Sequence, residues 1–333
     1  MELTRRDFVS FSAGAALAVT MPAAAANRPN SRIRGVQIGT ITYSFRDMKD
    51  QSAEAILKYC LGSGISAIEL LGDAAEAYAG IPADPNGARL GYFMMRRFAP
   101  NQAPLTIAEQ QELTTITADY HKVSSAWRAA ASLDKFQQLR RMYNAAGVSI
   151  YGFKPSVFES TSTAAEIDYG LRVAKALGAS HVTVELPTDV AFAKQLGDAA
   201  ASHGLRMAYH NHLQATPTLW DAALSASPGN AINLDLGHFT AAGDFDGVAF
   251  IRNHHARIAS MHMKDRKTKA NGAANLAWGE GDTPLAQALR LIRDERYPFP
   301  ATIEFEYAVP AGSDSVKEVA RCLEYCRQAL TRG

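Results

Sequence analysis

The chain has 333 residues, of which 47% are hydrophobic and 20% are charged, and its formal net charge at pH 7 is +1. A chain of this length and composition can bury one large core or two smaller ones. Because 34 Lys and Arg residues balance 33 Asp and Glu residues, no basic excess is present to neutralise phosphates or to hold the chain on an anionic membrane. The composition therefore argues against a nucleic-acid partner.

The first 30 residues differ from the rest of the chain. Arg5 and Arg6 precede a polar residue, Phe8 and a stretch of mostly small, apolar residues at positions 9–21, and a run of alanines follows. This order is typical of an export signal, and the arginine pair resembles a twin-arginine signal. The apolar stretch is shorter than the roughly 20 residues that a membrane-spanning helix needs. We therefore predict a signal peptide and linker at residues 1–30, twin-arginine export to the periplasm, and no stable membrane association after signal cleavage.

From residue 36 to residue 330, short β-rich runs alternate with longer amphipathic stretches. Eight strands are expected, at residues 36–43, 66–70, 149–153, 181–185, 206–210, 231–235, 258–263 and 301–305. The clearer helices are expected at residues 53–61, 109–146 with a break near 129–134, 164–177, 189–203, 219–225, 246–253, 284–293 and 315–330. Residues 72–106 contain four prolines and are expected to form an enlarged irregular loop after the second strand.

Eight strand–helix units in one domain predict an α/β fold, a single closed (β/α)8 TIM barrel over residues 31–333. The alternative is an open doubly wound sheet, which would favour a glycine-rich phosphate-binding loop after the first strand. Residues 39–44 supply no such loop. Cys60, Cys322 and Cys326 are expected to be small buried residues rather than a disulfide framework.

Ionisable side chains fall at the ends of the later predicted strands, where a barrel holds its chemistry. Glu185 ends the fourth strand and Asp235 ends the sixth, while His262 and Glu304 lie near the ends of the seventh and eighth. An ionised carboxylate is costly to bury unless it is paired or bound to a metal. We therefore predict that these four residues converge on a divalent metal ion. Three carboxylates and one imidazole suit Mn²⁺, Mg²⁺ or Co²⁺, and Zn²⁺ is also possible.

Four segments, in this order and spacing, resemble one known family. They are Val-Glu-Leu-Pro at 184–187, Leu-Asp-Leu-Gly-His at 234–238, Met-His-Met-Lys-Asp at 261–265 and Ile-Glu-Phe-Glu at 303–306. Together they are similar to the xylose isomerase-like barrels, which include sugar phosphate isomerases, ketose 3-epimerases and inosose dehydratases. The resemblance covers residues 36–330. It implies the metal site named above, acid and base roles for Glu185 and Glu304, and contact of His238 with substrate oxygens.

Four other residues are weaker candidates for substrate binding: His210, His212, Lys154 and Lys264. Either histidine would serve equally well as a hydrogen-bonding support for a neighbouring ligand. Lys154 is equally well explained as a surface lysine. Lys264 and Asp265 follow His262 and would anchor the substrate or, as we favour, orient that histidine.

Three further features leave alternatives open. Glu69, at the end of the second strand, either faces the pocket or forms an ion pair at the barrel rim. Glu306 shares a strand face with Glu304 and is the alternative ligand, although Glu304 fits the resembled family better. Residues 278–282 resemble a loop that covers the site in that family, yet Gly and Asp are also ordinary turn residues.

These features predict an isomerase or epimerase that acts on a non-phosphorylated sugar, keto-sugar or polyol through an enediolate intermediate. Export favours a free sugar, because phosphorylated sugars are mainly cytoplasmic. A 3-keto-glycoside lyase or dehydratase on the same metal site is the nearest alternative, and a non-catalytic sugar-binding barrel is another. The DNA endonucleases that share this barrel are disfavoured by the balanced charge. The expected partner is a small carbohydrate, and homo-oligomers are common in the resembled family.

Overall fold

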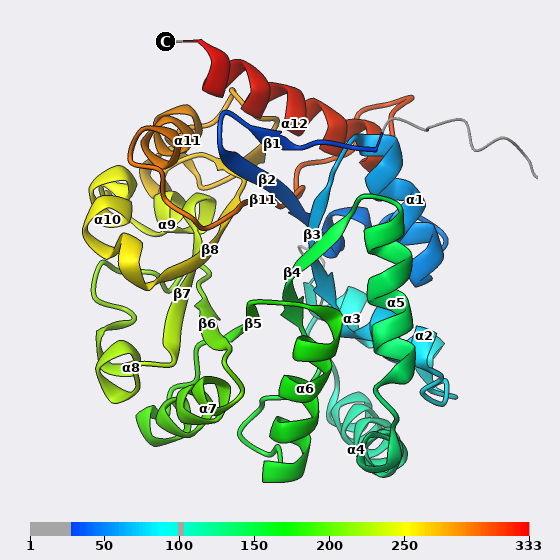
Figure 1. The fold of residues 1–333 in the computed structure, drawn as a ribbon. Coiled ribbons are helices and arrows are strands. Elements are labelled where there is room, and N and C mark those ends of the chain that lie inside the picture. Colours follow the sequence, from blue (N-terminus) through cyan, green and yellow to red (C-terminus); the bar gives the residue numbers. More distant parts are fainter. Residues whose placement is uncertain (1–27, 99–102, 333) are drawn as a thin grey trace, which may run out of the picture.

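The computed structural model describes residues 28–98 and 103–332, so the arginine pair and apolar stretch of the predicted signal lie outside the described residues. Eight parallel strands close into a barrel, which confirms the predicted fold (Figure 1). In barrel order they are β2 (Val36–Ile41), β3 (Ala67–Leu71), β4 (Ser149–Lys154), β5 (His181–Glu185), β6 (Arg206–His210), β7 (Asn230–Asp235), β8 (Ile258–Met263) and β11 (Ala301–Ile303). Parallel pairing of β11 with β2 closes the ring. The short strand β1 (Arg32–Ile33) adds antiparallel to β2.

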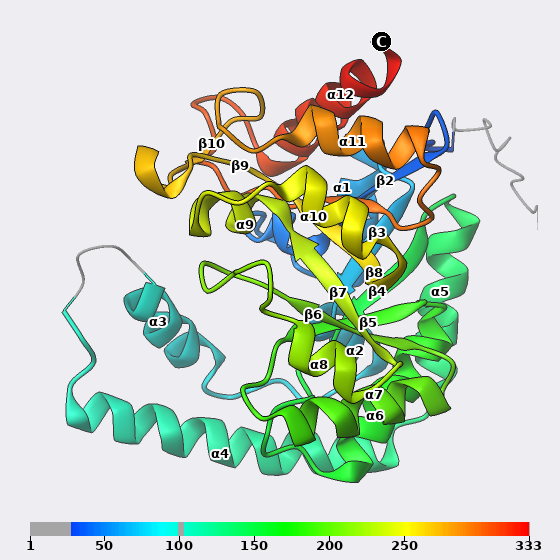
Figure 2. The same ribbon diagram turned by 90° about the vertical axis from the view of Figure 1, so that its left-hand side faces the viewer.

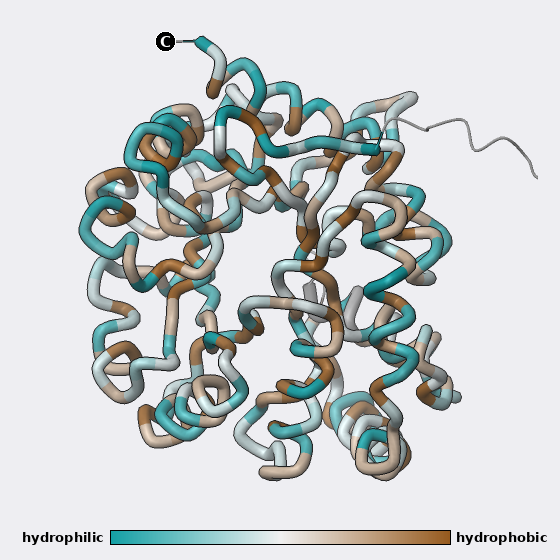
Figure 3. Tube along the Cα trace, viewed as in Figure 1, coloured by the Kyte–Doolittle hydropathy of each residue, from teal (hydrophilic) through white to brown (hydrophobic). Residues whose placement is uncertain are grey.

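Helices surround the barrel (Figure 1). They are α1 (Ala53–Ser63), α2 (Gly72–Ala79), α3 (Gly87–Phe98), α4 (Ile107–Ala130), α5 (Asp134–Ala145), α6 (Ala164–Leu177), α7 (Val190–Ser202), α8 (Asp221–Ala226), α9 (Leu236–Ala242), α10 (Gly247–His254), α11 (Leu285–Asp294) and α12 (Ser315–Thr331). The strands are buried on both faces, as expected of a parallel sheet covered by helices. Figure 3 shows hydrophobic residues along the strands and alternating hydropathy along the outer helices.

Local sequence signals account for where several helices begin and end. Thr163 and Glu166 form a capping box at the start of α6, and Gly178 ends that helix in the left-handed conformation, with φ 87°. Thr106 and Glu109 form a second capping box at the start of α4. The expected break near residues 129–134 is confirmed, because Ala131 leaves the helical conformation between α4 and α5.

The expectation of an irregular loop over residues 72–106 is wrong. This stretch contains α2 and α3, and of its described prolines, Pro82 and Pro85 lie between the two helices while Pro104 precedes α4. Prolines mark the helix boundaries here, where they are tolerated, rather than the absence of helices. The short hairpin of β9 (Asp265–Arg266) and β10 (Asn275–Leu276) was not expected either.

Figure 2 shows α3 and α4 extending beyond the barrel on the side that also carries α9 and the β9–β10 hairpin. Because α9 and β9 directly follow β7 and β8, this is the side at which the parallel strands end. The cysteines are free and buried, as expected. Within residues 28–98 and 103–332, no helix combines the length and apolar character needed to cross a membrane.

Candidate metal centre

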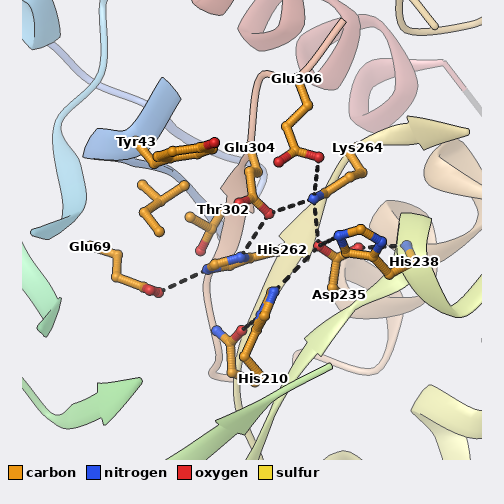
Figure 4. Close-up of polar contacts among 12 residues, drawn as sticks. Tyr43, Glu69, His210, Asp235, His238, His262, Lys264, Thr302, Glu304 and Glu306 are labelled. Carbon is orange, nitrogen blue, oxygen red and sulfur yellow. Dashed lines mark hydrogen bonds and ion pairs between the residues drawn. The ribbon is translucent and has the colours of Figure 1, made fainter. Parts of the chain in front are cut away.

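Four buried side chains meet where β6, β7, β8 and β11 end. They are His210, Asp235, His262 and Glu304, and one potential ligand atom from each lies within 4.8 Å of those of the others. Three of the four predicted ligands are therefore brought together. The fourth position belongs to His210, which sequence analysis considered only for substrate contact or support. Figure 4 shows the cluster.

Asp235 places a carboxylate oxygen that accepts no hydrogen bond from the described residues inside this cluster. The residue ends β7 and caps α9, so its Oδ1 accepts the backbone N–H of His238 at 2.7 Å. The other oxygen, Oδ2, is buried and accepts no hydrogen bond from the described residues. Its nearby cation is the Lys264 ammonium, at 3.0 Å. Burial raises the pKa of Asp235, although Lys264 opposes the shift. A buried acceptor without a hydrogen bond fits a site for a cation.

His262 lies between two carboxylates. Its Nδ1 is 3.0 Å from Glu304 Oε2, and its Nε2 is 3.1 Å from Glu69 Oε2. Burial disfavours a charged imidazole, but the two carboxylates outweigh it and raise the pKa of His262 to about 10. Glu69 is fully buried, so the open question about this residue is settled in favour of an ion pair, which lies inside the barrel rather than at its rim. Such a carboxylate is the usual support of a metal-binding histidine.

Lys264 brings a positive charge to the centre of the cluster. Its Nζ lies 3.0 Å from Asp235, 2.9 Å from Glu304 and 2.7 Å from Glu306, with the side chain only 2% exposed (Figure 4). Burial opposes this charge, but the carboxylates raise the pKa of Lys264 above its usual value. Gly237 makes room for the lysine, since a Cβ at that position would lie 2.2 Å from Lys264 Cγ. Glu306 contacts the cluster through Lys264 and is not one of the four grouped residues.

Glu185 stands apart from the four grouped residues. Its side chain is 55% exposed, and its two oxygens contact Lys154 Nζ at 2.8 Å and His212 Nε2 at 3.1 Å. Burial of the carboxylate would raise its pKa, but the His212 hydrogen bond and the Lys154 charge hold the pKa of Glu185 well below its usual range. Glu185 and Lys154 also line a cavity of about 430 Å³ between the segments that follow β4 and β5. That volume suits a small ligand.

His238 is held in a defined protonation state by Arg266. The guanidinium Nη1 donates to His238 Nδ1 at 2.6 Å, so a neutral His238 carries its proton on Nε2. Burial lowers the pKa of His238, and the nearby cations lower it further. His238 lies next to His212, with ring centroids 4.9 Å apart, and these two histidines form a second close group with His210. His238 therefore presents a hydrogen-bond donor beside the cluster.

Asp265 has a different role from the one expected. Rather than orienting His262, its Oδ2 accepts the backbone N–H groups of Gly279 at 2.7 Å and Gly281 at 3.0 Å. Gly281 must be small, because a Cβ there would lie 2.0 Å from Asp265 Oδ1. The carboxylate thus fixes the 278–282 loop, and the orientation of His262 falls to Glu69 and Glu304.

The chain is thus a TIM-barrel protein with a candidate metal centre, because buried carboxylates and imidazoles meet at the strand ends of its closed (β/α)8 barrel. Within that class, residues 107–326 match the family model described as xylose isomerase-like TIM barrel, and the chain belongs to this family. Among curated proteins, none matches the chain.

Solved structures share this fold at low sequence identity. A xylose isomerase domain protein from Alicyclobacillus acidocaldarius subsp. acidocaldarius has a TM-score of 0.57 and 15% identity, covering 89% of this chain and 100% of its own. The probable 3-DHS dehydratase AsbF of Bacillus anthracis has a TM-score of 0.57 and 15% identity, covering 86% and 97%. A sugar phosphate isomerase/epimerase from Parabacteroides distasonis ATCC 8503 has a TM-score of 0.56 and 15% identity, covering 90% and 96%. These likenesses concern the fold alone.

Proposed function

We propose that the chain is a metal-dependent isomerase or epimerase of a non-phosphorylated sugar, keto-sugar or polyol, exported to the periplasm. The observation that carries the proposal is the buried group of Asp235, His262 and Glu304, in which Asp235 Oδ2 accepts no hydrogen bond from the described residues. Family membership supports the class of activity. The arginine pair near the N-terminus supports the place of action.

Asp235, His262 and Glu304 would hold the metal ion, and their oxygen and nitrogen donors suit Mn²⁺, Mg²⁺, Co²⁺ or Zn²⁺. When bound, such an ion supplies an electrophile for the oxygens next to the carbon that loses a proton. Glu69 keeps His262 oriented with Nδ1 toward the cluster. With Nε2–H donated to Glu69, binding of the metal would displace the other ring proton, the one that Nδ1 shares with Glu304.

Glu185 is the proposed base. It lines the cavity and stays ionised because His212 and Lys154 hold its pKa low. The exposed side of the carboxylate can take a proton from a carbon beside a carbonyl, and the same group can return that proton to the neighbouring carbon. Lys154, which already donates to Glu185, would also donate to a substrate oxygen. His238 would donate its Nε2–H to a second substrate oxygen.

Glu304 is the proposed second proton-transfer group. Its contacts with His262 and Lys264 lower its pKa against the effect of burial, so it also stays ionised. An epimerase needs one such group on each face of a planar enediolate, because the proton leaves one face and returns to the other. Glu185 and Glu304 come from β5 and from the end of β11, which lie opposite each other in the barrel with three strands between them in either direction.

A lyase is the second candidate function, and the Glu185–His212 pair favours it. The two groups are 3.1 Å apart, and the hydrogen bond to Glu185 raises the pKa of His212. One of them can remove a proton while the other protonates a leaving group on the same side of the substrate. The β-elimination of a 3-keto-glycoside, which loses the C2 proton and the C1 substituent, can use this arrangement.

Proton exchange in D₂O tests the proposal. Keto-sugars and 3-keto-glycosides are incubated with metal-loaded protein and followed by ¹H NMR. We expect deuterium to enter beside the carbonyl with the wild type and at least about 100-fold more slowly with Glu185→Gln, the scale of a lost general base. A released aglycone identifies the lyase, and an altered stereocentre identifies the epimerase. Tight binding of these sugars with no exchange in either protein would favour the non-catalytic sugar-binding barrel.

A further inference from the structure

A hydrogen-bond network runs through the barrel interior to His210. Starting at β5, Ser180 Oγ donates to the carbonyl of Tyr151 at 3.1 Å, and it lies 3.1 Å from His181 Nδ1. His181 Nε2 is 3.0 Å from Ser260 Oγ, which accepts Asn233 Nδ2–H at 2.6 Å. The network ends at His210, whose Nδ1 is 2.7 Å from Asn233 Oδ1. Its inner members, from His181 to His210, are buried.

Which atom donates in each hydrogen bond of this network follows from its first residue, Ser180. A carbonyl only accepts, so the Ser180 hydroxyl proton is used on Tyr151, and Ser180 Oγ accepts from His181 Nδ1–H. His181 Nε2 is then the acceptor for the Ser260 hydroxyl, and Ser260 Oγ accepts the Asn233 amide N–H. The Asn233 oxygen is left to accept a hydrogen bond from His210 Nδ1–H.

His210 therefore carries its proton on Nδ1 and has a lone pair on Nε2. That nitrogen lies inside the cluster, 3.9 Å from Asp235 Oδ2, the oxygen that accepts no hydrogen bond from the described residues (Figure 4). His262 is oriented similarly, with Nε2 donating to Glu69 and with Nδ1, 3.0 Å from Glu304 Oε2, facing the cluster. A ring N–H fixed by a neighbouring oxygen, with the opposite nitrogen free, is how proteins present a histidine to a metal.

We propose that His210 is a metal ligand through Nε2, and that Asn233, Ser260 and His181 are positioning residues that hold it in the binding tautomer. This inference rests on the proposed metal-dependent function and deepens it. The inner shell becomes His210, Asp235, His262 and Glu304, two nitrogens and two carboxylates. Glu185 then stays outside the shell, where its contacts with Lys154 and His212 keep it available for proton transfer.

The new donor set changes the expected metal preference. Two imidazoles in place of one shift the site from Mg²⁺ toward ions that accept nitrogen donors, such as Co²⁺ and Zn²⁺. A His210 that contacted the substrate instead would accept a hydrogen bond from a sugar hydroxyl, and its loss would leave metal affinity unchanged.

The test is a Co²⁺ titration of the metal-free mature protein, followed by visible absorption and calorimetry. His210→Asn is compared with His254→Asn, an imidazole that stacks on Phe250 and belongs to neither group of potential metal ligands. We expect one equivalent to bind to the wild type and to His254→Asn with similar affinity and spectra. His210→Asn should bind at least about 100-fold more weakly, above the range for loss of a supporting group, with an altered d–d spectrum.

The positioning role of the hydrogen-bond network is tested separately by Asn233→Asp, Asn233→Leu and Ser260→Ala. Asn233→Asp keeps the acceptor oxygen for His210, so it should retain most of the Co²⁺ affinity. Asn233→Leu and Ser260→Ala interrupt the network and should lower the Co²⁺ affinity by about 10- to 100-fold. Histidine ¹⁵N shifts of the metal-free wild type should show His210 protonated at Nδ1, a signature that a merely structural role would not require. Circular dichroism confirms that each variant is folded.

The outcomes separate the two proposals. If the wild type binds no Co²⁺, the proposed function fails together with this inference. If the wild type binds Co²⁺ and His210→Asn binds it equally well, the inference is overturned while the proposed function stands. A His210 ring protonated at Nε2 in the metal-free protein overturns the positioning role.

Discussion

Lys264→Met is expected to destabilise the metal-free protein strongly. The ammonium lies within 3.0 Å of three carboxylates, on Asp235, Glu304 and Glu306. At an effective dielectric constant of about 20, one such contact at about 3 Å is worth about 5 kcal/mol before desolvation is counted. Removing one partner of a buried ion pair lowers the free energy of unfolding by about 3–5 kcal/mol, since the remaining charges stay buried. We expect a loss of this size.

The assay is urea unfolding in EDTA, followed by circular dichroism and tryptophan fluorescence. Lys154→Met is the matched control, because Lys154 pairs with Glu185, whose side chain is 55% exposed, and such pairs are worth up to about 1 kcal/mol. A divalent ion at 100 times its Kd should restore about 2.7 kcal/mol to Lys264→Met. If Lys264→Met and the wild type unfold at the same urea concentration in EDTA, the reasoning about the buried cation is refuted.

Three further predictions follow from the buried groups. Burial lowers the pKa of His181 from 6.5 to about 4, so the unfolded chain binds its proton first. Preferential protonation of His181 in the unfolded chain should therefore lower the free energy of unfolding by about 3 kcal/mol as pH falls from 6.5 to 4, whereas this loss is absent above pH 6.5. The stability difference between wild type and His181→Gln should vary with pH across this window, and a constant difference would contradict the prediction. Glu69→Gln should weaken metal binding about 10- to 100-fold in a calorimetric titration, because it loses the carboxylate that orients His262; unchanged affinity would count against that support. Gly237→Ala places a Cβ 2.7 Å from the Lys264 backbone oxygen and should lower the free energy of unfolding by about 1–3 kcal/mol, which urea unfolding would disprove if the midpoint did not move.

The fold could be predicted from sequence because the barrel is built from repeated local signals. Each strand is a short apolar run, and each following helix has its own pattern and caps, as Thr163, Glu166 and Gly178 show for α6. The stretch 72–106 differs from the prediction because prolines alone do not distinguish a loop from the boundaries of short helices. Pro82 and Pro85 lie at helix boundaries, and the amphipathic pattern of α3 was the signal that would have found that helix.

The candidate site was only partly predictable, because its contacts join distant strands. Asp235, His262 and Glu304 were found from charges at strand ends, where burial demands a partner. The place of His210 depends on Asn233 and Ser260, and neither carries a signal until the barrel brings them together. Glu69 shares this property, since its partner His262 is 193 residues away in the chain.

Anomalous diffraction from crystals soaked in Mn²⁺ would test the metal centre most directly. The account predicts one strong peak bonded to Asp235 Oδ2, His262 and Glu304 at about 2.0–2.3 Å, with the Lys264 ammonium moved away from these carboxylates. A map without a peak at saturating Mn²⁺, in which Lys264 keeps its contacts with Asp235 and Glu304, would contradict the account and show that a protein ammonium is the resident cation of this barrel.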